Sequence, residues 1–393
     1  MVGLSKIFEW PLNRVHCARI LHSLPEQSCT EAFLWNLYRN HVSSAKYYLP
    51  LLLLPPLFKW RQMNRKKLLS TFKYYAQATT FASCINALTF YLMCIGRRLY
   101  GRYVRILTPY LSCWLASQLT WWMPPRLLQF YGTGITHAAL EGLLRQSNAR
   151  LVQSRSAQTL VFMLCSMVIL CQQQAQLYSG FWFIKPDLLP VDYQKLTLSE
   201  RTKLALKELS KYFGIGLAVD LLNGYLRGKG KPSQLQWKST SFIVSYIAIY
   251  KLIQFLLVGR LTLGHINRLA AFVSGSAFAL LNRLTFMAFA VVIATQVIWQ
   301  RFCACDSRDS KRFQRPLTLL QSIPWAKLLI PCNLAYLVHS LIFQRHVVNG
   351  LARAFIDCTC DQNSQRLYKL LMLPDVSTIL TTIKTRPITP FLF

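Results

Sequence analysis

Acidic side chains are scarce in this sequence. Only 14 of its 393 residues are Asp or Glu, against 45 Lys or Arg, and the formal net charge is +31. Charged residues make up 15% of the chain and hydrophobic residues 53%. Too few polar residues remain to cover the surface of an ordinary water-soluble domain. The excess of basic residues favours partners that carry phosphate.

The sequence also lacks the common motifs of enzyme active sites. It contains no G-x-x-x-x-G-K-[ST] loop, no G-x-S-x-G turn and no convincing carboxylate pair. Its seven histidines are scattered, without the i, i+4 pairs that metal hydrolases use. We therefore expect no catalytic residue, no cofactor and no metal ion.

The twelve cysteines do not indicate a disulfide framework, because most of them lie inside apolar runs, where a free thiol behaves as a small hydrophobe. The two C-x-C pairs, Cys303/Cys305 and Cys358/Cys360, lack the C-x-x-C spacing and the companion histidine of zinc sites. We expect reduced thiols.

Long uncharged runs are the strongest signal in the chain. A membrane-spanning helix needs about 20 predominantly apolar residues. The runs of that length or close to it are 74–96, 106–125, 156–184, 239–259, 284–300 and 328–344, and shorter ones are 47–58, 127–140, 212–226 and 269–282. Two of them carry one charge each, Lys251 in 239–259 and Asp220 in 212–226. The sequence therefore predicts an all-α, polytopic helical membrane protein with about eight to ten membrane-embedded segments.

Basic clusters directly flank these runs, at the level of lipid headgroups. We expect six residues to contact anionic headgroups: Arg65, Lys66, Lys67, Arg97, Arg98 and Arg102. The predicted partner is thus the lipid bilayer and not a nucleic acid. Because both loops that flank 74–96 are basic, the positive-inside rule gives no orientation, which weakly favours an organelle membrane.

The order of segments predicts five parts with two weakly repeated halves. The parts are an N-terminal segment 1–43, a first helical half 44–184, a polar connector 185–211, a second helical half 212–345 and a C-terminal tail 346–393. Each half has a short leader, a longer helix that ends in Gly-Arg, two apolar pieces divided by an arginine, and a final helix.

Four residues are candidates for lining a polar cavity: Tyr250, Lys251, Arg126 and Arg283. A charge such as Lys251 near the middle of a spanning helix costs about 2.5–3.5 kcal/mol, so it should face protein or water. The alternative is that Lys251 snorkels to the membrane surface. Arg126 and Arg283 are either turns between two helices, the commoner outcome, or charges buried within long helices.

A set of small residues predicts close packing of one helix against another. They recur at a spacing of about four positions, which lets a second helix approach. The set consists of Ala270, Ala271, Ser274, Gly275 and Ala279.

Several motifs resemble the transmembrane protein 135 family over nearly the whole chain. They are Cys17-x4-His22 followed by Ser28-Cys29, the basic exit Cys94-Ile95-x-Arg97-Arg98-x-x-Gly101-Arg102, the segment Ser245-x-x-x-Ile249-Tyr250-Lys251, and the small-residue stretch Ala270–Gly275. The chain departs from the family pattern at Ala271, where the family has glycine, at Arg283, where it has lysine, and in a shorter connector.

The resemblance implies a non-enzymatic multi-pass membrane protein of mitochondria and peroxisomes, linked to mitochondrial fission and to lipid or cholesterol handling. Organelle-division or lipid-handling proteins are the partners it implies. Two alternatives remain open: a transporter or channel for a small anion or a lipid, and an insect-type chemoreceptor channel. The last expects Thr-Tyr and Gln-Phe signatures near the C-terminus, and the ending TTIKTRPITPFLF has neither.

Overall fold

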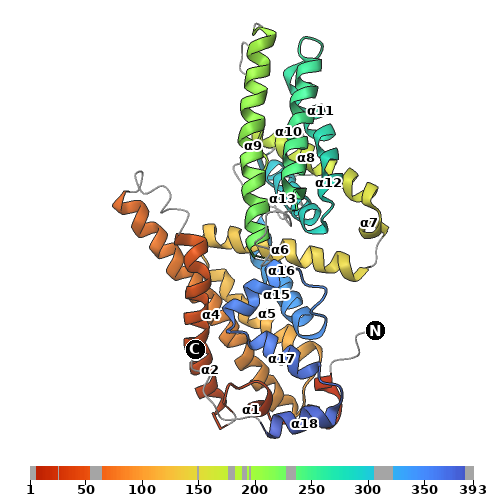
Figure 1. Cartoon of the computed structure of the whole chain (residues 1–393). Coiled ribbons are helices and arrows are strands. Elements are labelled where there is room, and N and C mark those ends of the chain that lie inside the picture. Colours follow the sequence, from red (N-terminus) through yellow and green to blue (C-terminus); the bar gives the residue numbers. More distant parts are fainter. Residues whose placement is uncertain are drawn as a thin grey trace, which may run out of the picture. The chain divides into compact units, whose positions relative to one another are not determined.

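The structure is a computed structural model that describes residues 6–24, 26–53, 64–147, 150–175, 182–187, 193, 196–226, 236–304 and 322–385. Within these ranges every regular element is a helix, apart from an isolated bridge between Val258 and Leu261. The helices form two compact units (Figure 1). Unit 1 consists of Met1–Gln146 and Ile323–Phe393, and unit 2 of Ser147–Ser322. The all-α prediction is confirmed.

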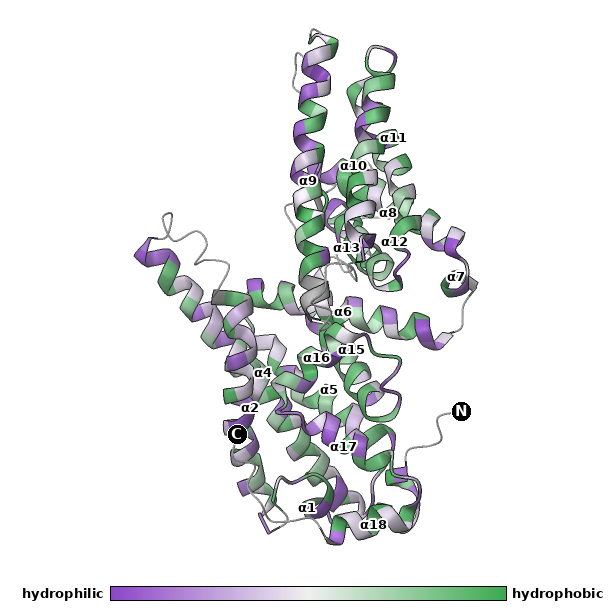
Figure 2. Ribbon diagram, viewed as in Figure 1, coloured by the Kyte–Doolittle hydropathy of each residue, from purple (hydrophilic) through white to green (hydrophobic). Residues whose placement is uncertain are grey.

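Five helices are long and apolar enough to cross a bilayer. They are α4 (Arg65–Tyr100) and α15 (Trp325–Phe343) in unit 1, and α8 (Arg155–Gln174), α10 (Lys238–Leu257) and α13 (Leu284–Ala304) in unit 2. They coincide with five of the predicted uncharged runs, although residues 176–181 of the run 156–184 lie outside the described residues. Figure 2 shows how apolar residues dominate their middle turns. The chain is therefore a helical protein of membrane type.

The core of unit 1 joins elements from both ends of the chain. Its remaining helices are α1 (Cys17–Ile20), α2 (Cys29–Tyr48), α5 (Ser112–Ala116), α6 (Pro125–Ser147), α16 (Gly350–Thr359), α17 (Asn363–Leu371) and α18 (Val376–Lys384). One hydrophobic cluster contains buried residues from every one of them. The expected tail 346–393 is thus folded as far as residue 385, because α16, α17 and α18 are amphipathic and bury their apolar faces.

The last part of the expected polar connector, residues 198–211, is helical in unit 2, and local hydrogen bonds explain where this helix begins. Thr197 and Glu200 form a capping box, in which each residue's backbone N–H donates to the other's side chain. This box begins α9 (Leu198–Leu226), which carries no proline. Residues 198–211, predicted to belong to the polar connector, and the run 212–226 are therefore one continuous helix.

The run 106–125 is broken into short pieces. A π-helical turn, η5 (Ile106–Leu111), contains Pro109, and after α5 the 3-10 helix η6 (Ser117–Trp122) precedes Pro124 and Pro125. Proline removes a backbone donor and clashes with the preceding turn, so a straight helix is not possible here. The run 106–125 is therefore not a single straight helix.

The two units do not coincide with the two predicted halves. Helix α8, the last of the predicted first half, belongs to unit 2, and α15, the last of the predicted second half, belongs to unit 1. Within unit 2, α8 packs on α13 and on α11 (Leu263–Ser274). Within unit 1, α15 packs on η5, α5 and η6. The final helix of each predicted half therefore packs in the unit that contains most of the other half.

Small residues bring α8 and the end of α11 into backbone contact. A Cβ atom added to Gly275, in the 3-10 turn η9 (Gly275–Ala277), would lie 2.7 Å from the Cα atom of Met163. Ala270, Ala271 and Ser274 are fully buried beside it. Ala279 is exposed, because the 3-10 turn interrupts the i, i+4 register before α12 (Phe278–Leu281). Four of the five residues predicted to pack closely are thus buried at this contact.

We expect Gly275→Ala to lower the free energy of unfolding by about 1–3 kcal/mol, because the backbone of α8 must move to admit the methyl group. Gly264→Ala in α11 is the matched control, since no atom lies within 4 Å of the added Cβ. Thermal unfolding in detergent micelles, followed by circular dichroism, measures both. Equal melting temperatures for the two variants would contradict the close approach.

Candidate functional site

Unit 2 contains a cavity of about 720 Å³ that we call the arginine cavity. Three helices supply its walls: the last turns of α8 (Met167 to Gln174), the first turns of α11 (Gly264 to Arg268) and the end of α13 (Val297 to Arg301). Its volume lies within the range of about 300–1,000 Å³ that is typical of small-molecule sites.

The position of the arginine cavity follows from the helices that form it. Both α8 and α13 are candidate membrane spans, and the cavity lies at the C-terminal end of each. The ends of spanning helices meet the headgroup region of a bilayer. The first turn of α11 faces the cavity as well, and a helix N-terminus carries partial positive charge. The cavity therefore combines apolar walls with a position at the ends of two candidate spans.

The charge of the arginine cavity is positive. Arg268 and Arg301 line it, and among the described residues that line it none is acidic. Both guanidinium groups lie close enough to Cys171 to act on its thiol electrostatically. Planar guanidinium groups bind phosphate and carboxylate through paired hydrogen bonds. The arrangement is thus suited to an anionic group that carries apolar chains.

Amide side chains form the polar wall between the two arginines. Gln172, Gln174 and Asn267 line the cavity, and the buried side-chain oxygen of Gln172 accepts no hydrogen bond. Gln174 donates through its amide nitrogen to the hydroxyl of Tyr250, which in turn donates to Asn267 Oδ1 at 3.5 Å. Tyr250, predicted to line a cavity, therefore orients two residues of the wall and is itself fully buried behind them.

Lys251 makes a buried ion pair. Its Nζ atom lies 2.6 Å from Glu208 Oε2 of α9, and the side chains of Lys251 and Glu208 are 12% and 5% exposed. Lys251 also donates to the backbone oxygen of Asp187 at 3.3 Å, while the N–H of Asp187 donates to Glu208. The side chain thus faces protein, as one of the two sequence interpretations requires, and its charge is neutralised by a carboxylate that the sequence did not point to.

The other two cavity candidates lie at helix starts. Arg126 is exposed at the second residue of α6. Arg283 directly precedes α13 and follows Asn282, whose φ of 38° turns the chain at the end of α12. Arg283 therefore lies in a turn between helices and Arg126 in the first turn of one, and neither residue lines the arginine cavity.

The six predicted headgroup residues lie at the two ends of α4 and just beyond it. Five are exposed, namely Arg65, Lys66, Lys67, Arg98 and Arg102. Arg97 is half-buried and donates to the backbone oxygens of Arg14 and Val15. Contact with headgroups stays a prediction for all six.

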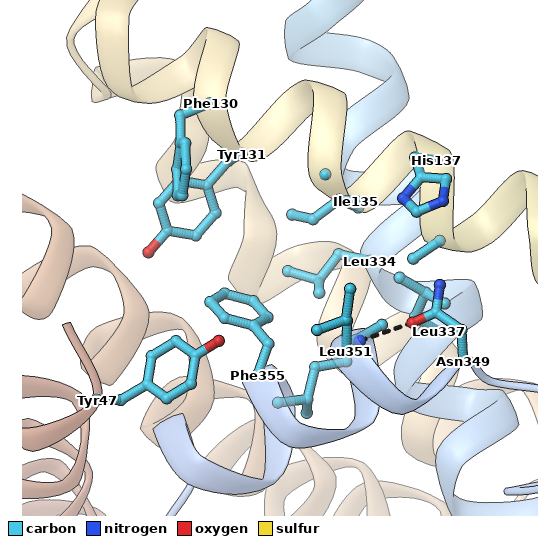
Figure 3. Close-up of a pocket in the computed structure, with 14 residues that line it drawn as sticks. Tyr47, Phe130, Tyr131, Ile135, His137, Leu334, Leu337, Asn349, Leu351 and Phe355 are labelled. Carbon is cyan, nitrogen blue, oxygen red and sulfur yellow. Dashed lines mark hydrogen bonds between the residues drawn. The ribbon is translucent and has the colours of Figure 1, made fainter. Parts of the chain in front are cut away.

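Unit 1 has a smaller cavity, of about 250 Å³, with mostly apolar walls from α2, α6, α15 and α16 (Figure 3). Tyr47, Phe130 and Phe355 lie at one end, and His137 and Asn349 at the other. Asn349 caps α16 by accepting from the N–H of Ala352 at 2.7 Å, the contact drawn as a dashed line. Asn349 is thus engaged in a contact within the protein, and the cavity offers a ligand mainly apolar contact.

Four potential metal ligands converge elsewhere in unit 1: Cys17, His22, Cys29 and Cys94. All four are buried, and their ligand atoms lie within 4.8 Å of one another. The sequence contained part of the signal, since three of them fall within thirteen residues. It missed the group because the fourth residue is 65 positions further along the chain, in α4.

The chain matches no protein-family model, no curated protein and no solved structure. The resemblance to the transmembrane protein 135 family therefore stays an expectation.

We expect Lys251→Met to destabilise unit 2 by about 3–5 kcal/mol, because it leaves the Glu208 carboxylate buried without a counter-charge. The double variant Lys251→Met/Glu208→Leu removes both charges and should recover most of the lost stability. Thermal unfolding in micelles measures both. A double variant no more stable than Lys251→Met would show that the pair is not the cause.

Proposed function

We propose that this chain is a non-enzymatic membrane protein that binds anionic lipids in the arginine cavity and takes part in lipid handling. The observation that carries the proposal is the pairing of Arg268 of α11 with Arg301 of α13. Both line a cavity at the ends of two candidate spans, α8 and α13, whose other walls are mainly apolar and amide side chains.

The ligand chemistry follows from the walls. Two guanidinium groups favour a phosphate monoester or diester, because each can donate two parallel hydrogen bonds to its oxygens. Met167, Val168 and Ile298 offer apolar surface to an acyl chain. An anionic phospholipid satisfies both requirements.

Binding of short-chain phosphatidic acid to the purified chain in micelles tests the proposal. We expect Arg268→Gln/Arg301→Gln to weaken binding by about tenfold to 100-fold, the loss typical of hydrogen bonds to a charged group. The control Arg155→Gln/Arg260→Gln removes the same charge from exposed positions outside the cavity and should bind as the wild type does.

Two further ligands separate the possible occupants. Short-chain phosphatidylcholine, which has no net charge, should bind more weakly than phosphatidic acid. If inorganic phosphate binds as tightly as phosphatidic acid, the acyl chain contributes nothing. That outcome would overturn the lipid proposal and favour the alternative of a small-anion transporter.

We further propose that the protein works in mitochondrial or peroxisomal membranes, where it contributes to lipid or cholesterol balance and to mitochondrial fission. The support is the resemblance to the transmembrane protein 135 family, together with basic residues at both ends of α4.

Imaging of a tagged copy against mitochondrial and peroxisomal markers tests this localisation. We expect overlap with at least one of the two markers. Restriction to the plasma membrane would contradict the proposal and would favour the chemoreceptor alternative.

We also propose that the halves are repeats with exchanged final helices, and that shorter segments bring the embedded total to about eight to ten. In the first half, α4 is followed by the broken segment η5 to η6 and then by the unbroken helix α6. In the second half, α10 is followed by the broken segment α11 to α12 and then by the unbroken helix α13. The final helices α8 and α15 are exchanged, so each unit still contains one final helix. Exposed apolar side chains on the broken segments, such as Ile106, Trp122 and Leu280, support their contact with lipid.

A further inference from the structure

Three short stretches of unit 1 bring three thiols and one imidazole together. Cys17 begins α1, His22 follows that helix, Cys29 begins α2, and Cys94 lies near the end of α4. Each of the four residues is at most 5% exposed. Buried thiols are common, but a buried histidine whose ring faces a group of thiols is not explained by apolar packing.

The distances within the group fit a single tetrahedral ion. Sγ of Cys17 lies 3.6 Å from Sγ of Cys29, and Sγ of Cys94 lies 3.3 Å from Nε2 of His22. Bonds of about 2.3 Å to sulfur and about 2.05 Å to nitrogen in a tetrahedral site separate two sulfurs by about 3.8 Å, and sulfur from nitrogen by about 3.6 Å. Small side-chain shifts would therefore complete the coordination.

The orientation of His22 is fixed from outside the group. Its Nδ1 atom lies 3.0 Å from the backbone oxygen of Gln27, which can only accept a hydrogen bond. Nδ1 therefore carries the proton, and the lone pair of Nε2 points at the thiols. A carbonyl that orients a histidine in this way is the usual outer partner of a histidine ligand to a metal.

The position of Cys29 favours a thiolate. Cys29 is the first residue of a 20-residue helix, where the helix dipole stabilises negative charge. A metal ion bound by cysteine requires the deprotonated form, so this position helps to bind one.

Two arginines hold the backbone that carries the first two ligands. Arg366 donates to the backbone oxygens of Leu21 and His22, at 3.4 Å and 3.1 Å. Arg97 donates to the backbone oxygens of Arg14 and Val15, just before Cys17. These contacts fix the stretch from residue 14 to residue 22.

We propose that Cys17, His22, Cys29 and Cys94 bind one structural zinc ion. Three thiolates and one imidazole in a tetrahedral arrangement form a closed site, with no open position for water, and this ligand set is typical of structural zinc. A two-iron cluster does not fit, because ligands on different irons lie further apart than 4.8 Å, which is the limit here. The ion would tie the first 30 residues to the end of the spanning helix α4.

The metal content of the full-length chain, purified in detergent without chelators, tests the proposal. Elemental analysis by mass spectrometry should find about one zinc per chain. Replacement of zinc by Co²⁺ should give the intense visible absorption of tetrahedral thiolate coordination, and removal of the ion should speed cleavage by trypsin after Arg14 and Arg19.

Paired variants on one helix provide the control. Cys94→Ser should lose most of the bound zinc, whereas Cys84→Ser, on the same helix α4 and outside the group, should keep it. Cys29→Ser, on a different helix, should lose zinc as Cys94→Ser does. If Cys94→Ser fails to fold, the wild-type stoichiometry and the Co²⁺ spectrum still decide.

Three results would overturn the proposal. The first is a folded wild-type chain with less than about a tenth of an equivalent of zinc. The second is iron in place of zinc. The third is a disulfide between Cys17 and Cys29, found by peptide mapping of the protein purified under non-reducing conditions, since that bond removes two of the four ligands.

Discussion

Carboxylate groups stabilise the helices of both units, either at a helix start or opposite a basic side chain. The chain has only 14 of them, and most of those described have a structural contact. Four cap helix starts: Glu31, Glu200, Asp220 and Asp375. Five pair with a basic side chain: Glu141, Asp187, Glu208, Asp357 and Asp361. Nine of the described carboxylates thus have a structural contact of one of these two kinds.

Asp220 illustrates how one such contact positions a spanning helix. It lies in α9 and accepts from the backbone N–H groups of Ser239 and Thr240, at 3.2 Å and 2.8 Å, at the start of α10. Gly216, one turn earlier, allows the two helices to touch, because an added Cβ would lie 2.7 Å from the Cα of Thr240. The same pair of helices carries Glu208 and Lys251 further along. The packing of α9 on α10 therefore also brings Glu208 to Lys251 and neutralises its charge.

The sequence predicted what depends on local composition. Uncharged length identified the long helices, and small residues identified the contact at Gly275. It could not predict what depends on distant partners: the neutralisation of Lys251 by Glu208, the two arginines that meet in one cavity from α11 and α13, or the approach of Cys94 to Cys17. Hydropathy also misjudged residues 198–211, since a helix cap and a neighbouring helix stabilise a polar segment that composition alone reads as a connector.

The exchange of α8 and α15 sets the order in which the chain can be completed during synthesis. Unit 2 is a continuous stretch, so all of its helices are present once residue 322 has been made. Unit 1 begins first but lacks α15 until residue 343, and α15 lies against its η5, α5 and η6. The segments η5, α5 and η6 are therefore made long before α15, the helix that covers them. The part of the protein that is made first is the last to close.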